Sequence, residues 1–417
     1  MQLKRVVVTG LGAITPIGNT ASQYWEALLN GVSGCDTITN FDPSKFKTRI
    51  ACEVKNFNVG DYFEVKEAKR LDRFSQFGLI AASEAIEDSG LHTANINKDR
   101  VGVIWGSGIG GLSIFQNEIR DFFRGDGTPR FNPFFIPKMI IDICPGHISM
   151  KYGFRGMNYA TVAACASSTN ALIDSFNYIR LGKANAIVTG GSEAPITEGG
   201  VGGFSAMKAM SERNDDPKTA SRPFDANRDG FVAGEGAAGI VLEEYEHAIA
   251  RGAKIYAEMI GGGLSADAYH LTAPDPSGEG VILVLNDALN DAGLDISSVD
   301  YVNVHGTSTP LGDVAELKAL QQVFGENAYK MNISSTKSMT GHLLGAAGAI
   351  EAAATILSIK NDMIPPTINH ETFDPEIDPK LNLTINKAQA RVVNVALSNT
   401  FGFGGHNATV VFKKFIL

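Results

Sequence analysis

The sequence contains few cysteines, and they are not spaced as metal ligands would be. Only 4 cysteines occur among 417 residues, and there is no Cys-x-x-Cys pair. A disulfide framework and a cysteine-ligated zinc site are therefore not expected, and the chain is predicted to act in the reducing cytoplasm. Most of the 8 histidines also lack ligand spacing, so metal catalysis is not expected.

The chain also lacks long apolar runs and an excess of positive charge. No apolar stretch reaches the roughly 18 residues that span a membrane, and the apolar run near the N-terminus is too short for a signal peptide. The net charge is −9, from 36 basic and 45 acidic residues, so a nucleic-acid partner is not expected. The remaining composition, 44% hydrophobic and 19% charged, is that of a globular protein with ample material for a large core.

Short apolar runs alternate with segments of helical periodicity along the whole chain. Several runs are continuous in valine and isoleucine, as in strands that are buried on both faces of a sheet. This alternation predicts an α/β protein with helices covering the sheets. The predicted strands are Lys4–Thr9, Val101–Trp105, Asn158–Ala164, Ala186–Thr189, Ala237–Glu243, Ile255–Ile260, Val299–Val304, Asn332–Ser335, Val392–Ser398 and Ala408–Phe412. The predicted helices include Ser22–Leu29, Asp72–Asp88, Ser168–Leu181, Gly280–Asp291, Asp313–Phe324 and Gly345–Lys360.

Two pairs of similar segments indicate an internal duplication. The Gly-rich loop and strand that begin at Asp229 resemble those that begin at Phe401. The segment Asn158–Leu172 resembles Asn332–Leu344, because each runs from a strand through small residues into a helix. We therefore predict two similar halves. They comprise residues 1–253 and residues 254–417.

Cys165 lies between a predicted strand and a predicted helix. A thiol at a helix N-terminus is near unpaired backbone N–H groups, whose partial positive charge favours the thiolate. Because the thiolate is the reactive form of cysteine, this position suits a nucleophile. The alternative is a buried structural cysteine, which is common for a lone Cys.

Two histidines in Gly-rich surroundings favour the catalytic interpretation. His305 directly follows a predicted strand, and His342 precedes a helix of small residues, with Lys337 five positions before it. A thiol and two neutral imidazoles at strand ends suit covalent catalysis on an acyl group. The backbone N–H groups of Gly-Phe-Gly-Gly, residues 402–405, are predicted to form an oxyanion hole with the N–H of Cys165.

Two other motifs do not fit the functions that they imitate. Gly106–Gly111 matches Gly-x-Gly-x-x-Gly after a strand. The acidic residue expected about 20 positions later is missing, and the Phe-rich stretch Phe115–Pro137 is instead predicted to be an insertion outside the core. Asp225–Gly230 imitates a calcium loop, but Gly236 stands where the bidentate acid belongs.

Four segments together resemble the β-ketoacyl-[acyl-carrier-protein] synthases. They are Ala-Cys-Ala-Ser-Ser around Cys165, Val-His-Gly-Thr-Ser-Thr around His305, Ser-Thr-Lys-Ser-Met-Thr-Gly-His ending at His342, and Ser-Asn-Thr-Phe-Gly-Phe-Gly-Gly from Ser398. The resemblance extends from the first strand to the last. Elongating members with a Cys-His-His set match best, most like synthase II. Thiolases would carry a second catalytic cysteine late in the chain, initiating synthases use His and Asn, and chain-length factors lack the cysteine.

The resemblance implies a thiolase-like fold, in which two duplicated halves form a five-layer αβαβα sandwich, and it implies a homodimer. It also implies the elongating reaction of fatty-acid synthesis. An acyl-enzyme thioester would condense with malonyl-carrier protein and give 3-oxoacyl-carrier protein, carbon dioxide and free carrier protein. No cofactor is implied, because the phosphopantetheine arm arrives on the acyl carrier protein.

The resemblance also assigns roles to individual residues. Cys165 would hold the acyl chain, while His305 and His342 would assist decarboxylation and stabilise the enolate. Lys337 would order the histidines. Phe403 would gate the pocket, and its N–H would hold the oxyanion with that of Cys165. The residues implied to bind the substrate are Thr307, Thr309, Ile109, Phe204 and Phe401.

Two further features are implied by the resemblance, a basic docking surface for the acidic carrier protein and a site for Na⁺ or K⁺ found in some members. The docking candidates are Lys66, Lys69, Arg70, Arg130 and Lys208. The cation candidates are Asn303, Glu351, Ser398 and Asn399, of which Glu351 would also assist Lys337.

Two other functions stay open. One is a polyketide-type ketosynthase with a dedicated carrier protein. The other is a catalytically silent dimer partner, against which the intact Cys-His-His set argues. Preference for acyl length and unsaturation depends on the shape of the pocket, to which segments far apart in the sequence contribute.

Overall fold

The computed structural model describes residues 3–416 and is built around one sheet of 10 strands. Its order is β10-β9-β13-β14-β8-β1-β7-β6-β4-β5. Each of these strands corresponds to a run predicted from the sequence, although the bounds differ by a few residues. The strands are β1 Val6–Ile14, β4 Val101–Gly106, β5 Asn158–Thr161, β6 Ala186–Glu193, β7 Gly236–Glu244, β8 Ala257–Ala266, β9 Tyr301–Asn303, β10 Asn332–Ser334, β13 Val395–Gly402 and β14 His406–Lys413.

The sheet consists of two five-strand sets with the same topology. The orders β5-β4-β6-β7-β1 and β10-β9-β13-β14-β8 both place the third strand of the set at the edge and the first at the centre of the sheet. In each set the first two pairs are parallel and the last two are antiparallel. The sets join where β1 pairs with β8 from Val6 to Val8. This topology supports the predicted duplication, and a boundary at residues 253 and 254 stays a prediction.

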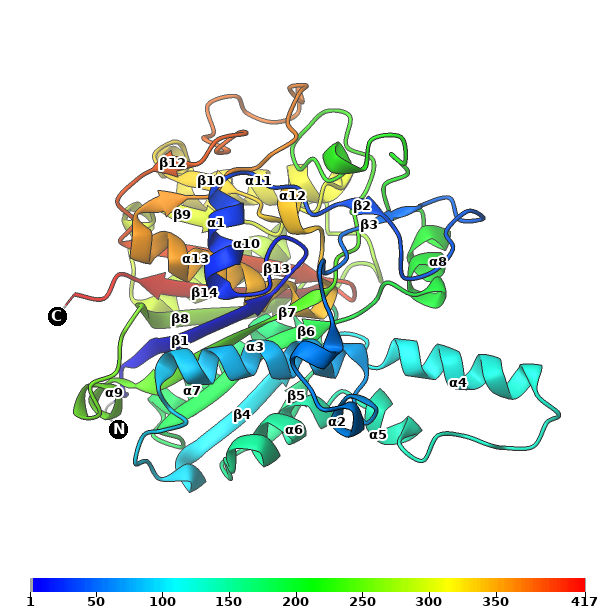
Figure 1. Cartoon of the computed structure of the whole chain (residues 1–417). Coiled ribbons are helices and arrows are strands. Elements are labelled where there is room, and N and C mark those ends of the chain that lie inside the picture. Colours follow the sequence, from blue (N-terminus) through cyan, green and yellow to red (C-terminus); the bar gives the residue numbers. More distant parts are fainter. Residues whose placement is uncertain (1–2, 417) are drawn as a thin grey trace.

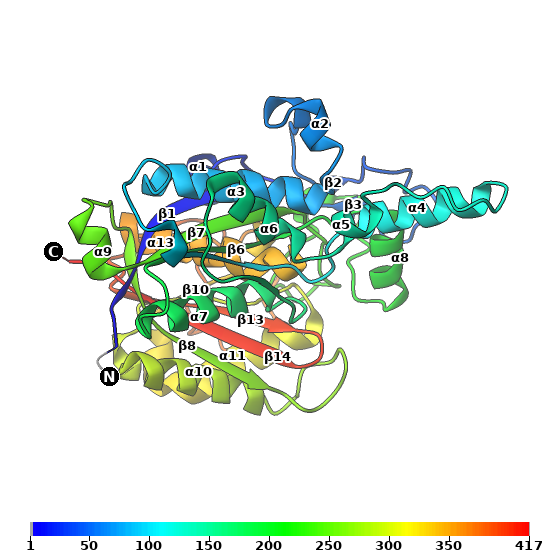
Figure 2. The same ribbon diagram turned by 90° about the horizontal axis from the view of Figure 1, so that it is seen from below.

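Helices form three layers around the two sets of strands (Figures 1 and 2). α3 (Arg73–Ser89) and α6 (Ile143–Tyr152) cover the outer face of the first set, and α10 (Glu279–Ala292) covers that of the second together with α11 (Pro310–Phe324). α7 (Ser167–Arg180) and α13 (Ala347–Asn361) lie between the sets. The five-layer αβαβα arrangement is therefore confirmed. Its two β layers are the two five-strand sets, which are joined through β1 and β8.

The two central helices approach each other closely because their contact residues are small. A Cβ atom added at Gly348 of α13 would collide with the side chain of Thr169 in α7. All but the last two residues of α13 are buried, including Glu351. This close packing brings the beginnings of both helices to one place.

The Phe-rich stretch leaves the body of the molecule as a long arm (Figure 1). The arm contains α4 (Leu112–Arg124) and α5 (Phe135–Met139), two helices that were not predicted. The side chain of Phe123 is 78% exposed, so the expectation that this stretch lies outside the core is confirmed.

The remaining elements are short, and no helix in residues 3–416 has the length and hydrophobicity of a membrane span. They are α1 Ala21–Leu29, α2 Val65–Ala68, α8 Glu198–Ala206, α9 Tyr245–Ala250, α12 Lys337–Thr340, β2 Asp36–Thr37, β3 Ile50–Ala51, β11 Met363–Ile364 and β12 Gln389–Ala390.

Candidate active site

A cavity of about 560 Å³ is lined by residues from both halves of the chain. It lies where the loops after β5, β9 and β13 meet the segment before α13. The structure brings most of the predicted catalytic and substrate-binding residues together here. Those that line the cavity are Cys165, His305, His342, Thr307, Thr309, Phe204, Phe401 and Phe403, with Lys208 of the predicted docking set.

Cys165 lies in a tight turn between the end of β5 and the start of α7. Ser167 fixes this turn, because its hydroxyl accepts a hydrogen bond from the N–H of Ala163 at 2.9 Å and donates one to the carbonyl of Ala164 at 2.6 Å. Ala164 has a φ of 48°, a left-handed conformation that is costly for a residue with a Cβ. The turn therefore holds the thiol at the N-terminus of α7, as predicted.

His342 contacts the thiol directly. Its Nε2 lies 3.0 Å from the Cys165 sulfur. The backbone of His342 is held on both sides, since its N–H donates to Val232 and its carbonyl accepts from Gly234, each at 2.8 Å. Gly341 has a φ of 67°, and a Cβ there would lie 2.8 Å from the sulfur of Cys52. Glycine is thus required before His342 by both conformation and space.

The sulfur is more strongly protonated than the sequence suggested. Burial raises the pKa of the Cys165 thiol to about 12, although the Lys337 charge and the Phe403 N–H lower it. The helix terminus was expected to favour the thiolate, but the loss of hydration outweighs it. A proton must leave the sulfur as it attacks, and Nε2 of His342 is positioned to accept it.

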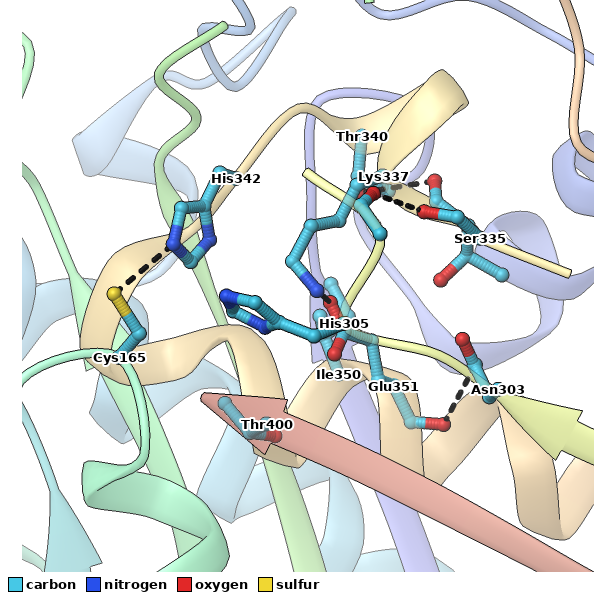
Figure 3. Close-up of polar contacts among 12 residues, drawn as sticks. Cys165, Asn303, His305, Ser335, Lys337, Thr340, His342, Ile350, Glu351 and Thr400 are labelled. Atoms are coloured by element: carbon cyan, nitrogen blue, oxygen red, sulfur yellow. Dashed lines mark hydrogen bonds and ion pairs between the residues drawn. The ribbon is translucent and has the colours of Figure 1, made fainter. Parts of the chain in front are cut away.

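The second histidine lies between His342 and a buried ion pair (Figure 3). The rings of His305 and His342 are 5.2 Å apart and nearly perpendicular. Lys337 and Glu351, each with a side chain only 1% exposed, form the ion pair. Burial and, next, the Lys337 charge lower the pKa of both histidines well below its ordinary value. Both imidazoles are therefore neutral at physiological pH and able to donate hydrogen bonds.

The β13–β14 hairpin closes over the sulfur. The N–H of Phe403 points at Cys165, and a Cβ at Gly402 would lie 3.0 Å from the backbone nitrogen of Cys165. The β13–β14 hairpin thus brings the Phe403 N–H and the Gly402 backbone next to Cys165, and the oxyanion hole formed by the N–H groups of Cys165 and Phe403 stays a prediction. The Phe403 ring lies 6.4 Å from that of Phe204, at the boundary of the cavity where a gate is expected.

The predicted substrate-binding residues divide into a polar and an apolar group. The hydroxyls of Thr307 and Thr309 lie 3.1 Å apart on the cavity wall. Ile109 packs with Phe204 against the cluster that contains Cys165, although Ile109 does not line the cavity. The polar wall suits an amide-rich arm, and the apolar wall suits an acyl chain.

Glu316 belongs to the site but was not predicted. It accepts the N–H groups of His305 and Gly306, both at 2.9 Å, and the side-chain amide of Asn399. Burial raises its pKa to about 7. The sequence signal was a carboxylate beside Leu317 on the apolar face of α11, where a charge needs a partner.

The predicted docking residues are exposed, and only Lys208 lines the cavity. Lys66, Lys69 and Arg70 lie at α2, which packs against the arm. Lys138 of the arm donates to the carbonyl of Lys69, and Arg70 stacks on an aromatic ring of the arm. Arg130 lies on the arm itself and pairs with Asp126 at 3.1 Å.

Part of the predicted cation set fits a monovalent ion. The side-chain oxygens of Asn303 and Ser398 and one oxygen of Glu351 are buried without hydrogen-bond partners in the described chain, and Asn303 pairs with Ser398 in the sheet. Asn399 differs, because its side-chain oxygen accepts from Thr409. Neutral oxygens with one carboxylate are suitable ligands for Na⁺ or K⁺. Residues 3–416 contain no cluster of His, Cys, Asp and Glu suited to other metals.

Family comparisons agree with the geometry. The description "Beta-ketoacyl synthase, N-terminal domain" matches residues 3–248, and "Beta-ketoacyl synthase, C-terminal domain" matches residues 256–371. The chain belongs to the β-ketoacyl synthase family. The resemblance inferred from its motifs is thereby confirmed.

Two relatives that are about half identical to the chain have the same name. The chain is 49% identical to 3-oxoacyl-[acyl-carrier-protein] synthase 2 of Synechocystis, over 100% of this chain and 99% of that protein. It is 50% identical to the protein of the same name from Staphylococcus aureus, over 99% of each chain.

Solved structures share the fold over the whole chain. A β-ketoacyl synthase from Burkholderia phymatum is 35% identical with a TM-score of 0.91, covering 99% of this chain and 100% of that one. A type II polyketide ketosynthase, solved in complex with its acyl-carrier protein, is 31% identical with a TM-score of 0.89 and covers 100% of both chains. The predicted thiolase-like fold is confirmed.

Proposed function

We propose that this chain is an elongating 3-oxoacyl-[acyl-carrier-protein] synthase of fatty-acid synthesis. The observation that carries the proposal is the placement of the Cys165 sulfur 3.0 Å from Nε2 of His342, with a second neutral imidazole and two backbone N–H groups beside it. A nucleophile, a proton acceptor and an oxyanion hole in one cavity suit acyl transfer.

In the first step, Cys165 takes the acyl chain from the carrier protein. The sulfur attacks the thioester carbonyl while its proton passes to His342, and the carbonyl electrons move onto an oxyanion held by the N–H groups of Cys165 and Phe403. The carbon–sulfur bond to the phosphopantetheine arm then breaks, and the departing thiolate takes the proton. Thr307 and Thr309 hold the arm, and the apolar cluster with Ile109 and Phe204 receives the chain.

In the second step, malonyl-carrier protein enters and loses carbon dioxide. The carbon–carbon electron pair becomes an enolate, whose oxygen accepts hydrogen bonds from the neutral rings of His305 and His342. In this step His342 is the neutral tautomer with its proton on Nε2, whereas the first step starts from the tautomer with Nε2 free. The enolate carbon attacks the carbonyl of the Cys165 thioester, the bond between that carbon and the Cys165 sulfur breaks, and 3-oxoacyl-carrier protein leaves. The Cys165 thiolate then takes up a proton from solvent. Burial and the Lys337 charge, which lower the pKa of both histidines, keep both rings neutral.

The polyketide alternative is less well supported. The relatives named 3-oxoacyl-[acyl-carrier-protein] synthase 2 are 49% and 50% identical to the chain, whereas the polyketide ketosynthase is 31% identical. The Cys165–His342 contact also argues against a silent dimer partner, which would not need the reactive pair.

The proposal includes a carrier-protein surface, a homodimer and a cytoplasmic location. Lys66, Lys69, Arg70, Arg130 and Lys208 would contact the acidic carrier protein. The edge strand β5 supports a homodimer, since exposed edges pair readily and Val162 beside it is 62% exposed. A monovalent cation near Asn303, Glu351 and Ser398 would be structural, and the cytoplasmic location stays a prediction.

Replacing the nucleophile tests the proposed reaction. With Cys165→Ala, condensation of acyl- and malonyl-carrier protein is expected to be lost, whereas release of carbon dioxide from malonyl-carrier protein is retained because the histidines remain. Product analysis by mass spectrometry and a carbon dioxide assay measure the two activities. Elongation by the variant would contradict the role of Cys165, and failure of the wild type to elongate would contradict the function.

A further inference from the structure

The loop Gly106–Gly111, which matches the Gly-x-Gly-x-x-Gly motif, surrounds the carboxylate of Glu193. Glu193 at the end of β6 is 0% exposed. One of its oxygens accepts from the hydroxyl of Ser107 at 2.9 Å and the N–H of Ile109 at 3.1 Å. The other accepts from the N–H of Gly108 at 2.7 Å. The N–H groups that would hold a phosphate in a nucleotide site are therefore occupied by an internal anion.

A further donor comes from the other half of the chain. The N–H of Gly345, three residues after His342, donates to Glu193 at 3.0 Å. The approach is close, because a Cβ at Gly345 would lie 2.6 Å from the same carboxylate oxygen. Glu193 thus links the loop after β4 to the segment that carries His342.

The hydrogen bonds fit an ionised carboxylate. The oxygen that binds Gly108 and Gly345 accepts from two N–H groups. The other accepts from the Ser107 hydroxyl and from the N–H groups of Ile109 and Gly110, so a proton would displace a donor. Burial raises the pKa of Glu193, whereas these donors lower it. Several aligned donors stabilise a buried carboxylate without a neighbouring cation.

The carboxylate is close to the reacting groups through its partners. Ile109 belongs to the apolar cluster that contains Cys165. The position that a Cβ would take at Gly108 lies 3.0 Å from Glu193 and 3.3 Å from the carbonyl of Ala164, next to the nucleophile. The negative charge of Glu193 also contributes to the high pKa of the Cys165 thiol.

The second half of the chain also has a buried carboxylate that accepts backbone N–H groups of a loop. There Glu316 accepts the N–H groups of His305 and Gly306 in the loop after β9, which is topologically equivalent to the loop after β4. In each half, a buried carboxylate therefore fixes the loop that follows the second strand of the set.

We propose that Glu193 is a positioning residue that fixes the loop with Ile109, part of the apolar cluster proposed to receive the acyl chain, against the His342 segment. It thereby aligns the acyl chain on Cys165 for condensation. This role rests on the proposed function, and it adds a residue that acts through Ile109 and Gly345 rather than on the substrate.

The test compares Glu193→Gln and Glu193→Asp with the wild type. The side-chain amide of Glu193→Gln places its own N–H groups opposite the backbone N–H groups that bind Glu193, and it removes the negative charge. Glu193→Asp keeps the charge on a shorter side chain. We expect Glu193→Gln to lower kcat for condensation about 100-fold, with a larger loss for long than for short acyl chains because the pocket wall moves. Glu84→Gln is the matched control, since Glu84 also accepts two backbone N–H groups, from Ala13 and Ala21, away from the site.

A second readout does not depend on the proposed reaction. The rate of Cys165 alkylation by iodoacetamide against pH gives the midpoint of the thiol titration. Removal of a neighbouring negative charge favours the thiolate, so the midpoint is expected to fall in Glu193→Gln and to stay in place in Glu193→Asp and Glu84→Gln. This measurement works even if the wild type does not condense carrier-bound substrates.

The outcomes separate a positioning role from a merely structural one. A wild-type chain-length profile and alkylation midpoint in Glu193→Gln would overturn the proposal, as would a loss equal to that of Glu84→Gln. If Glu193→Gln does not fold, Ser107→Ala removes one donor and is expected to shift the chain-length profile in the same direction, with a roughly tenfold loss. An unchanged profile in Ser107→Ala would then refute the role.

Discussion

Replacement of Lys337 by Met is expected to destabilise the protein in a pH-dependent way. Lys337 and Glu351 are each 1% exposed and form an ion pair in the core. Removing one partner of a buried pair costs about 3–5 kcal/mol. With about 2.1 cal/mol/K of unfolding entropy per residue and 417 residues, this corresponds to a fall in Tm of about 3–6 °C.

The sign of the pH dependence follows from Glu351. Burial raises its pKa to about 7 and Lys337 lowers it, so the variant has a still higher pKa. A carboxyl whose folded pKa lies above its unfolded value loses stability as pH rises between the two. The wild type stops losing stability near pH 7, whereas the variant continues, so the difference in Tm should widen from pH 6 to pH 8.5.

Calorimetry at both pH values measures the Tm of the wild type, of Lys337→Met, of the double variant with Glu351→Gln, and of a surface control, Lys55→Met. Lys337→Met with Glu351→Gln should remove the pH-dependent part, because no charge is left unpaired. Lys55→Met is the surface control, since its pair with Asp36 at 3.2 Å is exposed and worth about 1 kcal/mol or less. The reasoning is refuted if the Tm difference of Lys337→Met is the same at both pH values, or if the double variant keeps the pH dependence. The acid limb of malonyl decarboxylation should also move to higher pH, because Lys337 lowers both histidine pKa values.

Two further predictions concern the hairpin and the docking surface. Gly402→Ala places a Cβ 2.9 Å from the Ala163 carbonyl, against about 3.5 Å for ordinary contact. The Phe403 N–H should therefore move, and the rate of condensation should fall 100-fold or more. Gly146→Ala is the control, because its Cβ meets nothing within 4 Å and the rate should not change; equal rates for the two variants would contradict the oxyanion hole. Lys66→Glu with Lys69→Glu should raise KM for carrier-bound substrate and spare hydrolysis of a small thioester, and an equal loss on both substrates would argue against docking there.

The strands and the reactive residues could be predicted from the sequence because their signals are local. Continuous Val/Ile runs mark strands buried on both faces, and Cys165, His305 and His342 each stand in a short motif of small residues. The resemblance to a family then placed Phe403 and Thr307 in the same site. These residues do lie together in one cavity.

What could not be predicted depends on contacts between distant segments. Glu193 and Glu316 are single carboxylates without a motif, and their partners are backbone groups that meet only in the fold. The expected thiolate character of Cys165 was not found for the same reason. The helix terminus can be recognised in the sequence, whereas the burial of the sulfur, which raises its pKa, cannot. The arm helix α4 was missed because its Phe-rich sequence packs mainly against itself, as the stacked rings of Phe122 and Phe131 show.

The joint between β1 and β8 has a consequence for how the protein folds. Cys165 belongs to one five-strand set and His342 to the other. The sets meet along the ladder from Val6 to Val8, through the packing of α7 on α13, and where each of these helices lies against strands of the other set. Each set can gain its strands and helices before the two dock, as separate units of larger proteins do. The nucleophile and its proton acceptor meet only at docking. Catalytic activity is therefore the last property that a refolding chain recovers.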